Sequence, residues 1–270
     1  MAATLFKYAR MWGSLGRYTL ARELAFRGNF LVKISVEILW LLILVAFFGT
    51  VFGRTESIAG WDKWQYMFFV GCFFALNGLI ETLFLENCNE FAELVRTGDL
   101  DFLLLKPIDE QFLITCRRVD WGCALNIPMG FAVMGYSLAQ LGWPIDAISV
   151  AVFLVTFVCG TAIAYSFMLT LTSLSVWMVR NQSLMEMWWL FSSLARYPKE
   201  IFYGTWASPI GTFFTFFLPI LLVVSVPSQA MVKVLDWPMV GFTLVATLLC
   251  LGASRAFFRF ALKSYRSASS

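Results

Sequence analysis

The sequence of 270 residues contains no histidine. Without an imidazole, the chain cannot build Ser–His or Cys–His nucleophile systems or the commonest zinc and haem ligand sets. Its six cysteines form no CxxC pair and lie in or beside apolar runs, which is typical of buried thiols rather than of a disulfide framework. A GxxxxGK[ST] phosphate-binding loop is also missing, so the chain does not hold ATP in the Walker manner. We therefore expect no enzyme, and no metal or cofactor bound by this chain.

Charge is scarce as well. Only 14% of the residues are charged, whereas 60% are hydrophobic and the mean hydropathy is +0.75. Soluble domains are charged at roughly a quarter of their positions, so lipid must be the solvent for much of this surface. The basic residues form no run interleaved with aromatic residues, which excludes nucleic acid as an expected partner. The length suits one membrane domain with no separate soluble domain of usual size.

Apolar runs of sufficient length predict six membrane-spanning helices. They are Phe30–Phe52, Trp64–Leu85, Trp121–Leu141, Ile148–Val179, the shorter Ser183–Ala195, and Met239–Phe260.

The segment before the first run is different. Residues 1–29 hold five basic residues and place Leu5, Tyr8, Met11 and other apolar side chains at spacings of three and four. This pattern predicts an amphipathic helix at the membrane surface rather than a cleaved signal. We expect residues 30–262 to form the transmembrane domain and 263–270 a cytoplasmic tail.

The orientation follows from the twenty Lys and Arg residues. With a cytoplasmic N-terminus and six crossings, fourteen lie inside, five lie outside, and Lys33 lies within the first span. The fourteen are Lys7, Arg10, Arg17, Arg22, Arg27, Arg96, Lys106, Arg117, Arg118, Arg180, Arg255, Arg259, Lys263 and Arg266. Both termini are therefore expected in the cytoplasm.

A seventh apolar piece, Ile210–Val226, must then not cross, because a further crossing would place the basic tail outside. It is interrupted by Pro219 and ended by Pro227. Prolines remove backbone donors, and irregular backbone is tolerated at membrane depth only where protein or a water-filled cavity covers it. The expected structure of this piece is a re-entrant hairpin on the outer side, broken at Pro219.

Few ionisable residues fall inside the predicted spans. Lys33 and Glu37 are four residues apart, so they form either a proton or cation relay or, as we favour, a local ion pair with Lys33 extended to the headgroups. The group that precedes the third span (Arg117, Arg118 and Asp120) is expected to be an interfacial anchor. Glu81 and Glu186 are expected to face protein or a cavity, with no partner predicted.

The polar segment between the second and third spans has a helical pattern of its own. Asn89 can cap a short helix that Gly98 stops in the left-handed conformation. Phe91, Leu94 and Val95 form one apolar stripe. The segment is either a solvated loop or, as we favour, a helix that docks into a groove on a cytoplasmic partner.

Here the sequence resembles a known family, the ABC-2 type export permeases, in particular a six-span bacterial branch once known only as a domain of unknown function. The most specific segments are Thr97–Pro107 and Ala195–Phe202, supported by Leu218-Pro219 and Val226-Pro227. The resemblance implies an all-α membrane protein with six transmembrane helices, an N-terminal interface helix, a cytoplasmic coupling helix and an outer re-entrant hairpin.

The resemblance also implies roles for residues in two regions. Within the coupling region 86–111, the ATPase-coupling residues would be Glu90, Phe91, Glu93, Leu94, Val95, Arg96, Gly98, Asp99 and Asp101. In the re-entrant region, 197–231, and directly before it, the gate residues would be Arg196, Tyr197, Pro198, Pro219 and Pro227.

The function implied is that of the permease subunit of an ATP-driven exporter in the bacterial inner membrane, moving a hydrophobic or amphipathic substrate outward. Two separately encoded ATPase subunits would bind ATP and magnesium, and a second permease, identical or paralogous, would complete the transporter. The alternatives are an ATP-independent secondary transporter or channel, which would need a polar route through the spans, and a membrane-anchored scaffold. The substrate is left open.

Overall fold

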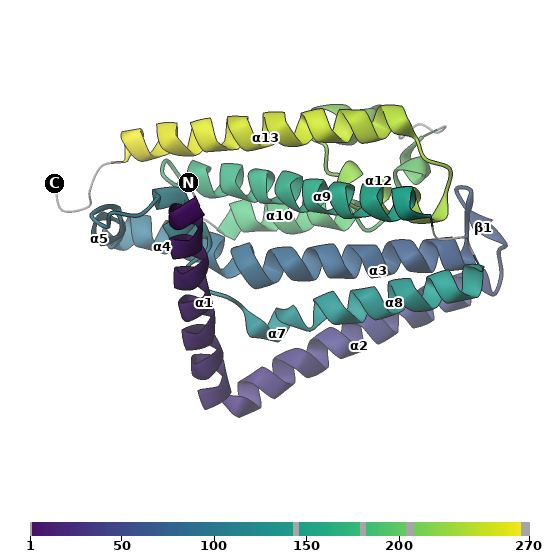
Figure 1. Cartoon of the computed structure of the whole chain (residues 1–270), viewed down its shortest axis with the longest axis horizontal. Helices are drawn as coiled ribbons and strands as arrows, with labels where there is room; N and C mark the ends of the chain where they lie inside the picture. Colours follow the sequence, from purple (N-terminus) through teal and green to yellow (C-terminus); the bar gives the residue numbers. More distant parts are fainter. Residues whose placement is uncertain (1, 143–145, 179–181, 204–207, 266–270) are drawn as a thin grey trace.

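The computed structural model describes residues 2–142, 146–178, 182–203 and 208–265. Within these described ranges, five helices are long and apolar enough to cross a membrane. They are α2 (Arg27–Phe52), the continuous helix Lys63–Thr97, Trp121–Leu141, α9 (Ala147–Leu174) and α13 (Trp237–Ser264). The axes of these helices are roughly aligned, whereas α1 (Ala2–Ala25) lies across them (Figure 1). The chain is therefore an all-α multi-pass membrane protein, as the sequence predicts.

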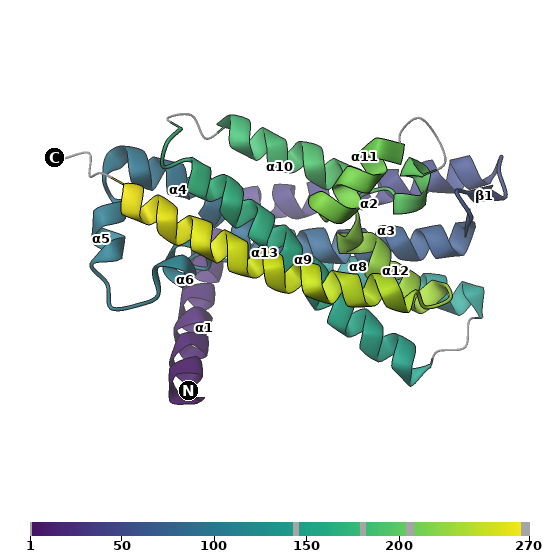
Figure 2. The same cartoon turned by 90° about the horizontal axis from the view of Figure 1, so that it is seen from above.

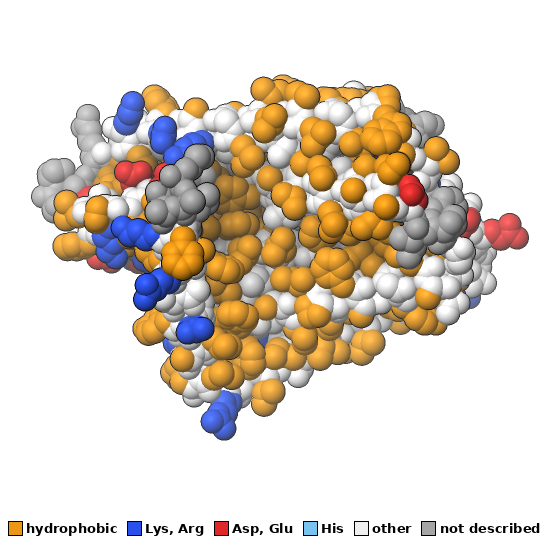
Figure 3. Space-filling model, in the orientation of Figure 1, with side chains coloured by type: hydrophobic (Ala, Val, Ile, Leu, Met, Phe, Trp, Pro, Cys, Tyr) orange, Lys and Arg blue, Asp and Glu red, His pale blue; other side chains and the backbone are white. Residues whose placement is uncertain are grey.

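The bundle has two different ends. At one end, which we call the β1 end, the strands β1 (Ser57–Ile58) and β2 (Trp61–Asp62) form a short antiparallel hairpin. The opposite end, which we call the α4 end, holds three short helices, and α1 and the last turn of α13 lie there too (Figures 1 and 2). The helices are α4 (Glu86–Thr97), α5 (Leu100–Leu104) and α6 (Glu110–Thr115). On the face in Figure 3, apolar side chains cover the body, and basic ones gather on α1 and at the α4 end.

Two helices of the bundle pack unusually closely. They are α3 (Lys63–Ile80), which begins with a reciprocal capping box between Asp62 and Gln65, and α8 (Asn126–Leu141), which continues the short α7 (Trp121–Ala124). A Cβ atom on Gly130 would lie 2.5 Å from the backbone nitrogen of Ala75, and one on Gly71 would lie 2.7 Å from the carbonyl oxygen of Gly130. Small residues at such contacts let helix backbones approach, and the extra van der Waals contact drives association in lipid.

The second span does not end where the sequence predicts. A π-helical turn, η1 (Glu81–Leu85), joins α3 to α4, so that one helix of 35 residues runs from Lys63 to Thr97. The prediction of a separate short helix capped by Asn89 is therefore wrong, because η1 lets the backbone continue through the polar residues. The predicted stop is confirmed, since Gly98 takes a left-handed conformation with φ of 81°.

The fourth helix is shorter than predicted, and the fifth has the predicted length. Helix α9 ends at Leu174, and Ser175–Trp177 form turns, so the expected continuation toward Val179 is wrong. Helix α10 (Gln182–Leu194) has 13 residues. It lies beside the bundle in Figure 2 and leads from the α4 end toward η2 (Lys199–Phe202). At the β1 end, the indole Nε1 of Trp61 donates to Glu200 at 3.0 Å.

The segment between α10 and α13 is bent. Helix α11 (Ser208–Thr212) and a π-helical turn, η3 (Phe213–Phe217), meet α12 (Leu222–Val232) at 91° across a break that contains Pro219. The predicted break at Pro219 is thus confirmed. Both ends of the segment contact the β1 end. Near its start, Glu200 accepts from Trp61, and at its end Lys233 Nζ donates to the carbonyl oxygen of Gly60 at 2.8 Å. A bend of this kind occurs in a broken span or a re-entrant loop, and the re-entrant hairpin stays a prediction.

The prediction that Pro227 ends the apolar helix is wrong, because α12 continues through it to Val232. Proline lacks the N–H that would reach the carbonyl four residues earlier, which is that of Val223. That carbonyl oxygen lies against Gly160 of α9, where a Cβ atom would be 2.4 Å away. The close approach of α9 covers the unpaired carbonyl, as irregular backbone at membrane depth requires.

Candidate functional sites

Phe91 is the largest apolar side chain of the predicted docking stripe, and the structure buries it within this chain. Its exposed fraction is 0%, and it packs with Leu100, Ile114, Leu169 and Phe258. The prediction of an exposed Phe91 is therefore wrong, because the stripe faces α9 and α13 rather than solvent. Leu94 and Val95 are only partly buried and lie at the edge of the same cluster.

The acidic residue beside it is also used within the chain. Glu90 forms ion pairs with Arg117 and with Arg118, the latter at 2.9 Å. Arg118 also reaches Glu86, which in turn lies 3.5 Å from Arg22 of α1. These arginines of the same chain neutralise Glu90, and its role at an ATPase interface stays a prediction. The predicted anchor holds α4 against the start of the third span.

Other predicted coupling residues do lie at the surface. Glu93 and Arg96 are exposed and form an ion pair with each other. Asp99 is exposed and accepts a hydrogen bond from the Thr97 hydroxyl at 2.9 Å. Asp101 is half-buried beside Tyr265.

The apolar side chains that the α4 end does present are ones the stripe analysis missed. Phe102 is 69% exposed and Leu105 is 82% exposed. They are three residues apart around α5, which places them on one face. Both belong to the segment Thr97–Pro107, so the signal was present in the sequence. Because Leu100 and Leu103 of the same segment point inward, only the outward pair is available to a partner.

Asp109, at the start of α6, joins this region to the last span, α13. The Asp109 carboxylate accepts from Arg255 at 2.7 Å and from the Phe112 amide at 3.1 Å, which caps α6. The Asp109 amide donates to Tyr8 Oη of α1 at 3.0 Å. Partial burial raises the pKa of Asp109, but the Phe112 amide and the Arg255 guanidinium outweigh it, so the pKa lies below its usual value. These contacts connect α1, α6 and α13.

A second candidate site is a cavity of about 370 Å³ between α2, α3, α8 and α10. We call it the lateral cavity. Its walls are mostly apolar and aromatic, but Glu37 and Glu81 line one part of it. The Asn126 Nδ2 donates to Glu37 at 2.7 Å, and the Asn77 Nδ2 donates to Glu81 at 2.7 Å. The two carboxylates and the Cys123 thiol lie within 4.8 Å of one another. Glu81 thus faces a cavity, as expected.

Lys33 does not pair with Glu37, as the spacing of four suggests, but with Asp120. The aspartate is brought to α2 by the turn that precedes α7, where it also caps the helix through the amides of Gly122 and Cys123. Because Lys33 is neutralised there, the acidic pair Glu37 and Glu81 takes part in none of the ion pairs found among the described residues. The other intramembrane acid, Glu186, is exposed on α10.

The predicted gate residues lie before the bend, within it and after it. The Arg196 guanidinium lies 5.2 Å from the ring centroid of Trp40 and 5.6 Å from that of Phe73, and it lines the lateral cavity. Tyr197 is 40% exposed beside it, Pro198 is buried, and the remaining two prolines lie at the bend and in α12.

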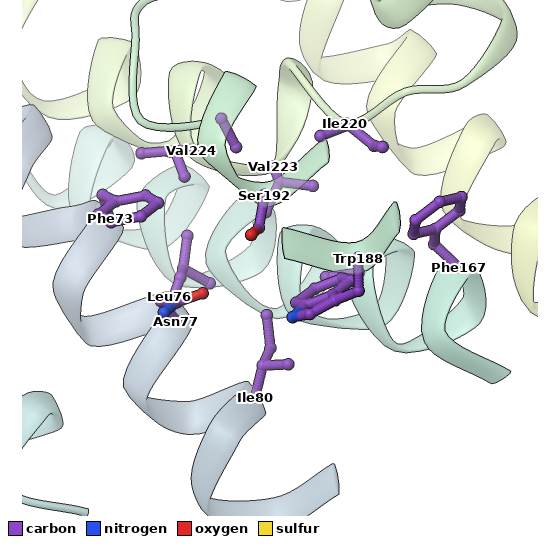
Figure 4. Close-up of a pocket in the computed structure, with 12 residues that line it drawn as sticks. Phe73, Leu76, Asn77, Ile80, Phe167, Trp188, Ser192, Ile220, Val223 and Val224 are labelled. Carbon is purple, nitrogen blue, oxygen red and sulfur yellow. The ribbon is translucent and has the colours of Figure 1, made fainter. Parts of the chain in front are cut away.

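A small apolar cavity of about 30 Å³ lies under α10 (Figure 4). Trp188 and Ser192 of α10 face Phe73, Asn77 and Ile80 of α3 there. The cavity is too small for an organic substrate, but it leaves the Trp188 Nε1 buried without a hydrogen-bond partner among the described residues. Helix α10 is therefore less tightly packed on α3 than α8 is.

Comparison with known proteins gives one match. A family model described as "ABC-2 family transporter protein" matches residues 38–269, which is most of the chain. No curated protein and no solved structure matches it. The matched part begins within α2, directly after Glu37, and includes the α4 end from α4 to α6 and the rest of the lateral cavity apart from Val36.

Proposed function

The chain belongs to the ABC-2 family of transporter proteins, and we propose that it is the permease subunit of an ATP-driven exporter. In this proposal it spans the bacterial inner membrane with both termini in the cytoplasm. It pairs with a second permease, identical or paralogous, and two ATPase subunits bind it and supply ATP and magnesium. Its substrate is hydrophobic or amphipathic and leaves the cytoplasm or the inner leaflet.

The exposed pair Phe102 and Leu105 at the α4 end carries this proposal. Large apolar side chains that project from a polar connection between two spans are expected to be covered by another protein. Aromatic anchors of this kind typically contribute most of an interface's binding energy, and charged neighbours such as Glu93 and Arg96 would lie at its rim. The coupling role therefore passes from Phe91 to α5, while α4 supports it from behind.

The contacts of the α4 end also suggest how movement would reach the membrane. Helix α4 continues directly into α3, and α6 is joined to α13 through Asp109 and Arg255. A shift of α5 caused by ATPase closure would thus move two spans. The bent segment at the β1 end, next to Arg196, would act as the outer gate.

The test is co-purification of the ATPase encoded beside this chain, with its hydrolysis rate measured in reconstituted membranes. Phe102→Ala and Leu105→Ala should each weaken ATPase binding on the order of 30-fold, because truncating a buried anchor costs about 2 kcal/mol. Leu248→Ala on α13, a side chain that is 72% exposed, is the matched control and should change nothing. If both α5 variants retain wild-type binding and hydrolysis, the proposed docking surface is refuted.

A second candidate function is that of an ATP-independent secondary transporter. The observation in its favour is the intramembrane acidic pair Glu37 and Glu81, since such residues often mark ion pathways. Transport that persists without ATP and follows an imposed ion gradient would favour this candidate. Transport that stops when the ATPase is inactivated would favour the exporter.

A further inference from the structure

The acidic part of the lateral cavity has more acceptors than donors. Both nearby amide groups are already used, because Asn77 donates to Glu81 and Asn126 donates to Glu37. Asn126 is 3% exposed, and its Oδ1 has no hydrogen-bond partner in the described part of the chain. The two carboxylates therefore lack a counter-charge, and the buried amide oxygen of Asn126 lacks a donor. A protonated amine supplies three N–H donors and one positive charge.

A positive charge without a carboxylate partner lies further along the same cavity. Among the described residues, Arg196 forms no ion pair, and its Nε is buried without a hydrogen-bond partner. The rings of Trp40 and Phe73 compensate for part of its charge through cation–π contact. A guanidinium at membrane depth that has no acid to bind is suited to an anionic group of a ligand.

The two charged parts line the same cavity, and an apolar groove follows them. Trp40, beside Arg196, is three residues from Glu37, which corresponds to about 4.5 Å along α2. Beyond Arg196, a groove of about 210 Å³ is lined by Phe47, Phe48 and Tyr197. The groove shares Trp40 and Arg196 with the lateral cavity. The order along α2 is thus amine acceptor, anion acceptor and apolar surface.

We propose that the lateral cavity binds a zwitterionic amphiphile whose amine contacts Glu37 and Glu81, whose anionic group contacts Arg196, and whose hydrocarbon lies along α2. A zwitterionic head group such as an ethanolamine phosphate carries both of the charges that these two parts would bind. This inference rests on the proposed permease function, because it names the class of substrate that the permease moves.

A metal ion at Glu37, Glu81 and Cys123 is the competing occupant, since these three side chains could converge on one ion. Such a site would leave Arg196 unexplained and would make no use of the aromatic wall. It predicts metal binding that depends on Cys123, whereas an amphiphile predicts none.

The experiment uses the full chain in dodecyl maltoside micelles and a fluorescent lysophosphatidylethanolamine as the probe, without the ATPase. Competitors are lysophosphatidylglycerol, which has only the anion, and dodecylamine, which has only the amine. The wild-type chain should prefer the zwitterion at least tenfold over either. Glu37→Gln with Glu81→Gln should remove the preference over lysophosphatidylglycerol, and Arg196→Gln should remove the preference over dodecylamine. Glu110→Gln, on the exposed start of α6, is the control and should bind as the wild type does.

The selective loss in each variant separates ligand contact from a structural role, which would reduce binding of all three compounds alike. Equal binding of the three compounds by the wild-type chain would overturn the proposal, and so would Zn²⁺ binding that Cys123→Ser abolishes. Repeating the titration in nanodiscs with and without phosphatidylethanolamine separates the two sources of this chemistry. Loss of probe binding in its presence identifies a membrane lipid as the occupant, and retained binding identifies another amphiphile. Because no ATPase is present, failure here leaves the docking test at α5 unaffected.

Discussion

Truncation of Phe91 should destabilise the chain itself rather than only its contact with an ATPase. The side chain is fully buried against Phe258, with ring centroids 6.3 Å apart, and three aliphatic residues complete the cluster. Removing a buried phenylalanine costs about 3–5 kcal/mol, since the cavity relaxes only in part. For a chain of this size, that corresponds to a fall of about 10 °C in the melting temperature. Phe91→Leu, which leaves a smaller cavity, should cost less.

The assay is thermal unfolding of the purified chain in detergent, followed by size-exclusion chromatography. Phe102→Ala is the matched control, because its ring is 69% exposed and exposed substitutions usually change stability by less than about 0.5 kcal/mol. A Phe91→Ala chain that keeps the wild-type melting temperature but no longer binds the ATPase would refute the reasoning. That result would restore Phe91 as the docking residue that the helical stripe predicts.

Three further results are expected. Gly130→Leu should prevent α3 and α8 from packing, because the new side chain would collide with the α3 backbone, and should therefore reduce the yield of monodisperse protein. Gly135→Ala is the control and should have little effect, because no atom lies within 4 Å of the added Cβ atom. Asp109→Asn should lower the melting temperature at neutral pH through loss of the Arg255 contact. Since the folded-state pKa of Asp109 lies below the usual 3.8, this stabilisation is fully present above that usual value and is lost as the pH falls through the folded-state pKa, so the difference between the wild type and the variant should shrink in acid. A cysteine at Ser57, in a background without native cysteines, should react with a membrane-impermeant reagent from outside intact cells, and labelling only after lysis would contradict the proposed orientation.

Five of the six predicted spans correspond to helices of the described residues that are long and apolar enough to cross a membrane, because each depends on a local property, a long apolar run, and the all-α membrane fold follows from them. The predicted fifth span, α10, is not among these five. The bend at Pro219 and the stop at Gly98 could be predicted for the same reason, since each is a property of one residue's backbone. The partners of charged and buried residues could not be. Lys33 pairs with an aspartate 87 positions away, although Glu37 is its neighbour on the helix.

The candidate docking site shows the same limit. The apolar stripe on α4 was read correctly as one face, but sequence alone does not say whether a face meets this chain or another. Here the last span supplies Phe258, and the stripe is covered. In the segment that follows α4, Leu100 and Leu103 point inward, whereas Phe102 and Leu105 are exposed. The sequence does not distinguish these two pairs. The polar lining of the lateral cavity also joins four helices that are far apart in the sequence.

The uninterrupted helix from Lys63 to Thr97 has a mechanical consequence. The 16 residues between Glu81 and Thr97 correspond to about 24 Å of rod. If the rod pivots at the π-helical turn, a tilt of about 5° displaces its tip by roughly 2 Å. Glu86 and Glu90, which form ion pairs with Arg118, lie nearer to that pivot than the tip does. The part of the helix between the pivot and these ion pairs is therefore the short arm of a lever. A modest push on the tip is thereby passed through these ion pairs to the start of the third span as a smaller and more forceful displacement.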